Sequence, residues 1–414
     1  MTTRERQGWM ISASLFVTLF LVFGSGYNTA GVFFTPLLKH FGWSRAQLST
    51  LTSALAVSGG LSAPLVGWLL DRVEARIVMI AGAALAGLAF LLASRANSFP
   101  PMLIAYLILG IGIGGSTLLP AALVIANWFG ARRGLAMGLT FAGTSLGGAA
   151  MTMVASRAIS FGGWRTGYVT LAIPMLVIVI PIIMVVIKTR PASADGQKIS
   201  VSEAADALPG LELSEALRTR SFWMIALAQF TFACAASGMG LHLITYLRGL
   251  GYAEAFAAGM MSLAYLFTSM GKFGMGFFAD RVSARRALAI NFVIAAFAMI
   301  LIFGAGRAWL LFPFVFIFGL TLGAPLVLIP LVTAESLGLK RFGLIGGIAG
   351  TFNTLGAAIG PVGAGKIFDA TGSYATAFQI FLVLLLIGCA SAILCRTLEA
   401  EQSALEREPA IATA

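Results

Sequence analysis

Long apolar runs separated by short polar stretches are the dominant pattern in this sequence. Each run is near or above the roughly 20 residues that a helix needs to cross the hydrocarbon core of a bilayer. The pattern therefore predicts an all-α membrane protein with twelve transmembrane helices. The expected helices cover residues 10–38, 46–70, 77–95, 99–129, 134–158, 164–187, 220–248, 253–279, 286–305, 308–334, 343–368 and 375–395.

An internal repeat relates the two halves of the chain. Residues Gly67–Arg76 match residues Gly276–Arg285 at a fixed offset of 209 positions. One copy follows the second expected helix and the other follows the eighth, so each half contains six helices in the same orientation. The repeat predicts two pseudo-symmetric six-helix halves.

Polar stretches set the expected domain boundaries. We predict an N-terminal half at 1–187, a Pro- and Gly-containing cytoplasmic linker at 188–219, a C-terminal half at 220–396 and a cytoplasmic tail at 397–414. Within the linker, Leu211–Leu217 is expected to form a short helix on the membrane surface.

Composition and charge agree with a membrane location. The chain is 59% hydrophobic and 10% charged, which excludes an ordinary soluble domain. With the N-terminus inside, most of its 27 Lys and Arg fall on inner loops and tails. This bias predicts a multi-pass membrane protein with both termini in the cytoplasm. It also accounts for the basic charge without a nucleic acid partner.

Lys272 is the one basic residue expected inside a helix. It stands eight residues before Asp280 at the helix end, which places it about 12 Å inside a hydrocarbon core about 30 Å thick. All sixteen Asp and Glu fall in tails, loops or helix ends. We therefore expect Lys272 to bind a transported small organic anion; the alternative is that its stem reaches the cytoplasmic face. The repeat pairs it with the neutral Ala63.

Other polar residues lie at similar depth in the expected helices. Each alone is more often a contact between helices than a ligand, but together with Lys272 they form a candidate substrate-binding set. His242 is also a candidate for proton coupling, as is Lys272, because histidine exchanges a proton near neutral pH; a structural role for His242 is equally compatible. The other members are Tyr27, Asn28, Ser116, Thr117, Tyr246 and Asn353.

Charged residues of the repeated motif and of a basic turn at 127–134 face the cytoplasm. We expect them to act as a latch that stabilises one conformation rather than as substrate ligands. These residues are Asp71, Arg72, Arg76, Arg132, Arg133, Asp280, Arg281 and Arg285.

Signatures of soluble enzymes are absent from the sequence. It contains no P-loop, no paired-cysteine motif and no His-Glu zinc pattern. Its three cysteines fall in or beside apolar segments, where we expect them in the core. The sequence therefore predicts a protein that is not an enzyme and that needs no cofactor or metal.

The repeated Gly-x-x-x-Asp-Arg-x-x-x-Arg loop, after helices two and eight of twelve, resembles the major facilitator superfamily over the whole chain. Four segments are also similar to the monocarboxylate transporter group and its bacterial oxalate/formate relatives. They are Trp128–Leu139 running into Ala142-Gly143, Gly26–Phe34, His242–Leu247 with Gly251-Tyr252, and Phe368–Tyr374.

The resemblance implies roles for three positions. The arginine that binds the substrate carboxylate in that group falls on Lys272, which keeps the charge but lacks the bidentate fork. An acidic residue of the animal members, used in proton coupling, falls on Thr268, which joins the candidate substrate-binding set. Their first-helix lysine falls on Asn28. Both positions depart from the group's pattern.

The expected function is secondary transport of small monocarboxylates of the lactate or pyruvate type, coupled to protons, by alternating access in a monomer. The alternatives are an oxalate/formate-like organic anion exchanger and a non-transporting membrane sensor of an organic anion.

Overall fold

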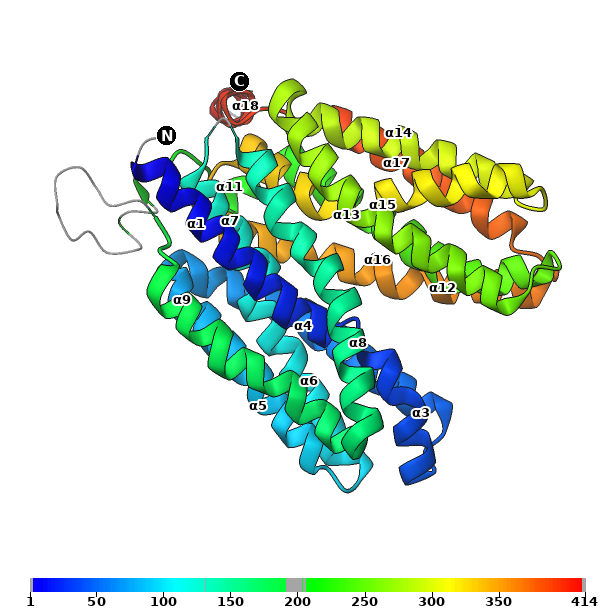
Figure 1. The fold of residues 1–414 in the computed structure, drawn as a ribbon. Helices are drawn as coiled ribbons and strands as arrows, with labels where there is room; N and C mark the ends of the chain where they lie inside the picture. Colours follow the sequence, from blue (N-terminus) through cyan, green and yellow to red (C-terminus); the bar gives the residue numbers. More distant parts are fainter. Residues whose placement is uncertain (1–2, 131, 191–202, 204–205, 412–414) are drawn as a thin grey trace. The chain divides into compact units, whose positions relative to one another are not determined.

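The structure is a computed structural model that describes residues 3–130, 132–190, 203 and 206–411. Nearly all of the described chain is helical (Figure 1). Its contacts divide it into two compact units. The first unit is Met1–Gly130 with Leu139–Ala207, and the second unit is Ala131–Gly138 with Leu208–Ala414. The predicted boundaries at 187 and 220 stay predictions.

The first unit carries the first six membrane-spanning helices. The first of them is broken into three pieces, since a π-helical turn and the non-helical residues Tyr27, Asn28 and Thr29 interrupt it. The fifth and sixth form one continuous run that bends at Gly163, whose φ of 77° favours glycine. The elements are α1 (Thr3–Thr18), η1 (Leu19–Phe23), α2 (Gly24–Gly26), α3 (Ala30–Phe41), α4 (Arg45–Arg72), α5 (Ala75–Arg95), α6 (Phe99–Ser116), α7 (Leu118–Trp128), α8 (Arg133–Pro174), η2 (Met175–Val179) and α9 (Ile180–Val186).

The second unit carries the other six, together with the first turn and a half of α8. Thr219 caps its first long helix by accepting a bond from the Phe222 amide. The elements are α11 (Leu213–Ala216), α12 (Arg220–Gly249), α13 (Glu254–Val282), α14 (Ala284–Leu301), η3 (Ile302–Gly304), α15 (Ala308–Leu337), α16 (Phe342–Thr371), α17 (Ala375–Leu394) and α18 (Leu398–Ile411).

The expected twelve-helix architecture is confirmed. Within the described residues, ten helical stretches are long and apolar enough to cross a membrane. One of them, Arg133–Val186, contains two spans on either side of Gly163. The remaining span is α13, which the sequence predicts at 253–279 and the structure places at Glu254–Val282.

The end of the expected linker docks on the loop between α15 and α16 within the second unit. Backbone amides of Leu211 and Leu339 donate to the carbonyls of Leu337 and Pro209, at 3.0 and 2.9 Å. Glu212 accepts from Arg341 at 2.9 Å and pairs with Lys340 at 3.0 Å. The expected helix at 211–217 is shorter than predicted, and 191–202 and 204–205 lie outside the described residues.

Small residues bring helices close together within each unit, as four-residue glycine spacing predicts. In the first unit, Gly143 faces the backbone of Phe16. In the second, Gly356 and Gly360 of α16 face the backbone of Phe230 and Cys234 in α12. Close backbone approach replaces hydrophobic burial as the packing device where lipid surrounds the helices.

Candidate functional site

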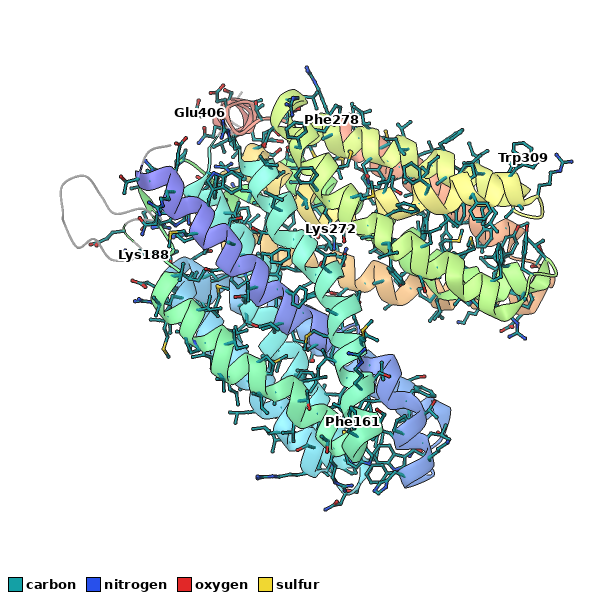
Figure 2. All side chains as sticks on the ribbon, viewed as in Figure 1. Phe161, Lys188, Lys272, Phe278, Trp309 and Glu406 are labelled. Carbon is teal, nitrogen blue, oxygen red and sulfur yellow. The ribbon has the colours of Figure 1, made fainter. Side chains whose placement is uncertain are left out.

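Lys272 belongs to the second unit and is almost fully buried. Its side chain is 2% exposed, and it lies on α13, ten residues before the helix ends at Val282 (Figure 2). A charged group buried in a membrane-spanning helix is costly, so Lys272 remains the main candidate for a functional residue. This burial favours an interior position of Lys272 over one in which its stem reaches the cytoplasmic face.

The stem of Lys272 lies against α15. Gly323 of α15 faces this stem, and an added Cβ at Gly323 would stand 2.9 Å from Cε of Lys272. Thr268 lies one turn earlier on the same face of α13, is 6% exposed, and also contacts Gly323. Its hydroxyl donates to the Ala264 carbonyl at 3.1 Å, so the hydroxyl is engaged by its own helix. One face of α13 therefore presents Thr268 and Lys272 to glycine on α15.

The first turns of α8 meet the same part of α13 within the second unit. An added Cβ at Gly138 would stand 2.7 Å from the Lys272 carbonyl oxygen. Nearer the helix end, Asp280 accepts from the Gly134 and Leu135 amides at 2.6 and 2.8 Å. A carboxylate at the start of a helix is a favourable partner for its unsatisfied amides.

His242 joins α12 to α16. Its Nε2 lies 2.9 Å from the Pro361 carbonyl, and its Nδ1 lies 3.1 Å from the Tyr374 hydroxyl. A carbonyl only accepts hydrogen bonds, so Nε2 must carry a proton. The tyrosine hydroxyl can donate to a neutral ring or accept from a protonated one. The ring can therefore gain a proton on Nδ1 while it keeps both contacts.

The hydroxyl of Tyr374 keeps its own proton. Burial and the nearby charge of Asp369 raise the pKa of Tyr374 above its ordinary value. This tyrosine sits between α16 and α17, and its ring packs beside that of Tyr246, whose hydroxyl donates to the Ile302 carbonyl at 3.1 Å. Tyr246 and His242 share a helix, as predicted, but their hydrogen-bond partners lie in different elements.

The remaining candidate of the second unit lies on α16. Asn353 is half-buried there, one turn after Ala349, which is buried. Its assignment to the substrate site stays a prediction.

The candidates of the first unit divide into two kinds. Tyr27 and Asn28 occupy the break between α2 and α3 and are exposed within the structure; Asn28 lies beside Gly148. Ser116 and Thr117 are buried, and their hydroxyls donate to the carbonyls of their own helix at 2.8 and 2.7 Å. These hydroxyls are engaged locally, as in many membrane helices, whereas the break leaves Tyr27 and Asn28 available.

The predicted latch residues of the first unit make local contacts. Asp71 is buried, and its charge acts on Arg190, which follows α9. Arg72 stacks on the Trp68 ring at 4.3 Å, and Arg76 pairs with Glu74 at 3.0 Å. These contacts join the motif loop to residues of the same unit.

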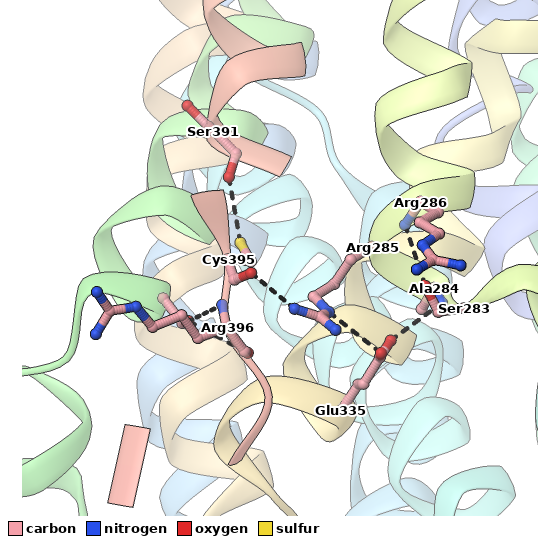
Figure 3. Close-up of polar contacts among 9 residues, drawn as sticks. Ser283, Ala284, Arg285, Arg286, Glu335, Ser391, Cys395 and Arg396 are labelled. Atoms are coloured by element: carbon pink, nitrogen blue, oxygen red, sulfur yellow. Dashed lines mark hydrogen bonds and ion pairs between the residues drawn. The ribbon is translucent and has the colours of Figure 1, made fainter. Parts of the chain in front are cut away.

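The second copy of the motif has a richer network. Arg285 bridges Glu335 of α15 at 3.2 Å and the Cys395 carbonyl at 2.8 Å (Figure 3). Glu335 also accepts from the Ala284 amide at 3.0 Å, and Arg281 stacks on the Phe277 ring at 3.5 Å.

The basic turn before α8 adds one member to this network. The charge of Asp280 acts on Arg133, while Arg132 is exposed. The latch role of these residues stays a prediction.

Sequence reasoning missed the roles of two positions. Gly323 stands four residues after Gly319, a spacing that indicates close helix packing but does not show that its neighbour is Lys272. Glu401 of α18 is 2% exposed and accepts from the Ser221 amide and hydroxyl at the start of α12. Among the described residues, no three His, Cys, Asp or Glu side chains are grouped to hold a metal ion.

The family profile described as Major Facilitator Superfamily matches residues 15–306 and 260–411. The chain belongs to this superfamily. This major facilitator is 24% identical over 408 residues to monocarboxylate transporter 12 of Mus musculus, covering 90% of this chain and 82% of that one. It is 25% identical over 406 residues to the uncharacterised transporter YcxA of Bacillus subtilis, covering 92% of this chain and 94% of that one.

Solved structures of the superfamily share its fold. The fucose transporter FucP in the outward conformation aligns with a TM-score of 0.70 and 18% identity, covering 93% of this chain and 98% of that one. The human organic anion transporter MFSD10 aligns with a TM-score of 0.72 and 16% identity, covering 95% and 100%. The superfamily match and the membrane-spanning helices together make this chain a multi-pass membrane transporter of the major facilitator type.

Proposed function

We propose that this transporter carries small monocarboxylates of the lactate and pyruvate type by alternating access. The observation that carries the proposal is the burial of Lys272, a cation 2% exposed in a helix that spans the membrane. Several relatives at about 25% identity are named monocarboxylate transporters, which supports the same substrate class.

A single lysine suits a single carboxylate. In a low-dielectric interior, one positive charge is best neutralised by one negative charge, and a second negative charge on a dicarboxylate would need a further cation. Lysine acts as a compact point charge, whereas arginine offers a planar fork that holds both carboxylate oxygens. We therefore expect tolerance of different small acids rather than strict recognition of one.

The test of this assignment is uptake of labelled lactate and pyruvate into vesicles that contain the purified protein. Lys272→Ala should lower uptake about 100-fold or more, since a buried charge partner of the substrate is lost. The matched control is Lys188→Ala, which removes the same charge from an exposed position after α9. Unchanged uptake by Lys272→Ala, at equal amounts of protein in the membrane, would refute the assignment.

We propose that a proton moves with the acid and that His242 accepts it. Its Nδ1 faces a tyrosine hydroxyl that can either donate or accept, so both protonation states keep their hydrogen bonds. The matched comparison is His242→Gln against His40→Gln, which alters the exposed histidine at the end of α3. Symport predicts that lactate entry acidifies the vesicle lumen and that lactate efflux makes it alkaline. His242→Gln should abolish this coupling while labelled exchange continues.

Exchange without a pH change would instead support an oxalate/formate-like exchanger. Binding of lactate without counterflow of label would support a membrane sensor. We further propose that the protein acts as a monomer in a bacterial-type inner membrane with both termini in the cytoplasm. Labelling of single cysteines placed near each terminus, from either side of the membrane, tests this orientation.

A further inference from the structure

The Lys272 stem faces a residue of α15 that has no side chain. A Cβ built at Gly323 would stand 2.9 Å from Cε of Lys272 and 2.8 Å from the Thr268 carbonyl oxygen, and would overlap Cγ2 of Thr268. Distances this short force one of the groups to move, and the flexible lysine chain moves more readily than the α13 backbone. Only glycine at this position leaves room for the lysine chain as it lies in the structure.

We propose that Gly323 is the positioning residue of Lys272, and that it sets where the ammonium group is held to meet the substrate carboxylate. The expected effect on transport rests on the proposed function. The contact itself is argued only from the packing of α13 against α15. A larger residue at 323 would displace the lysine chain and weaken recognition of the carboxylate.

Thr268 completes the arrangement. Its hydroxyl donates to the Ala264 carbonyl at 3.1 Å, and its Cγ2 methyl is the atom nearest the position where a Gly323 side chain would begin. The methyl and the lysine Cε therefore face the same glycine from two successive turns of α13. The space beside Gly323 of α15 is thus filled by two side chains of α13, Thr268 and Lys272.

The internal repeat allows the same helix contact to be compared in a unit with the lysine and in a unit without it. In the first unit, Gly110 and Gly114 correspond to Gly319 and Gly323. Gly114 approaches Ser62 and Gly59, so the close pairing of these helices exists without a lysine. In the second unit the same gap accommodates Lys272, whose counterpart is a small alanine. Glycine at this position therefore serves close helix packing in both units, and only in the second unit does it also make room for a cation.

A stability cycle tests the contact without any substrate. The variants are Gly323→Ala and Lys272→Ala, singly and together, with Gly319→Ala as the matched control. Gly319 lies one turn earlier on α15 and would meet Ala264 and Phe267 rather than the lysine. Lys272→Ala should recover part of the thermal stability lost in Gly323→Ala. In the Gly319→Ala background, by contrast, the stability changes of Lys272→Ala and Gly319→Ala should simply add.

Transport supplies the second readout. Gly323→Ala should raise KM for lactate or pyruvate about tenfold with a smaller change in maximal rate, since the displaced charge weakens binding. Gly319→Ala should leave KM within about twofold. If Gly323→Ala does not accumulate, Thr268→Ser/Gly323→Ala removes the methyl overlap, keeps the clash with Lys272, and should show the same KM increase.

The outcomes are distinct. The positioning role of Gly323 is overturned if the stability effects of Gly323→Ala and Lys272→Ala are additive. It is also overturned if Gly323→Ala has the same KM as the unaltered protein, even if Lys272→Ala abolishes uptake. Normal uptake by Lys272→Ala overturns the proposed function instead, while a non-additive stability cycle would still support the contact. Accumulation of Gly323→Ala only when Lys272 is also alanine supports it.

Discussion

Glu401 provides the sharpest stability prediction. It lies on α18, is 2% exposed, and its Oε1 accepts from the Ser221 amide at 3.0 Å and from the Ser221 hydroxyl at 2.5 Å. Ser221 is fully buried in the first turn of α12, and its oxygen also accepts from the Arg396 amide at 2.8 Å. The carboxylate thus ties the C-terminal helix to the start of a membrane-spanning helix.

The contacts set the size of the effect. Each hydrogen bond to a charged group is worth about 1.5 to 3 kcal/mol, and truncation leaves buried donors without an acceptor. A carboxylate at a helix start adds up to about 1 kcal/mol through the helix dipole. We expect Glu401→Ala to cost about 3 kcal/mol, and Glu401→Gln, which keeps an acceptor oxygen, about half of that.

The assay is thermal unfolding of the purified protein in detergent. For a unit of roughly 200 residues, about 1 kcal/mol corresponds to about 2 to 4 °C, so Glu401→Ala should lower Tm by about 6 to 12 °C. Glu406→Ala, on the same helix but exposed, is the matched control. A shift no larger than that of the control would show that the buried carboxylate does not hold α18 in place.

Three further predictions concern the linker, the histidine and the bend in α8. Burial raises the pKa of Glu212, but its partners Lys340 and Arg341 lower it by more, so the pKa lies below its ordinary value. The ion pairs of Glu212 should therefore hold at neutral pH and weaken as the pH falls through this lowered pKa, which faster proteolysis of the linker would report. Glu212→Gln should remove this pH dependence. Tyr374→Phe removes the hydroxyl that faces His242, and should shift the pH profile of uptake without abolishing counterflow. Gly163→Ala should cost about 1 to 3 kcal/mol because of its positive φ, whereas Gly306→Ala, with open space and no positive φ, should leave Tm unchanged.

Much of the architecture could be predicted because membrane helices obey a strong local rule. Every backbone polar group in a bilayer must be satisfied within its own helix, so a span of about 20 apolar residues is readable without knowledge of its neighbours. The repeat at Gly67 and Gly276 then predicts two related halves. The bend at Gly163 joins the fifth and sixth spans into one run, which the apolar pattern alone divides at 158–164.

The candidate site was only partly readable from the same pattern. Lys272 stands out because a charge within an apolar run is rare, and its burial is what that pattern predicts. The hydroxyls of Ser116 and Thr117 could not be assigned in advance, because a buried hydroxyl serves its own helix as readily as a ligand. Only the geometry shows that their bonds are local.

The sequence by itself determined the number of spans, the internal repeat and the position of one buried cation, since each depends on the contrast between polar and apolar residues along the chain. The tertiary structure alone decided that Gly323 faces Lys272, that Pro361 fixes which nitrogen of His242 carries a proton, and that Glu401 caps α12. The physical reason is that these contacts join residues from different helices, and helix packing is set by the shapes of facing surfaces rather than by local hydropathy.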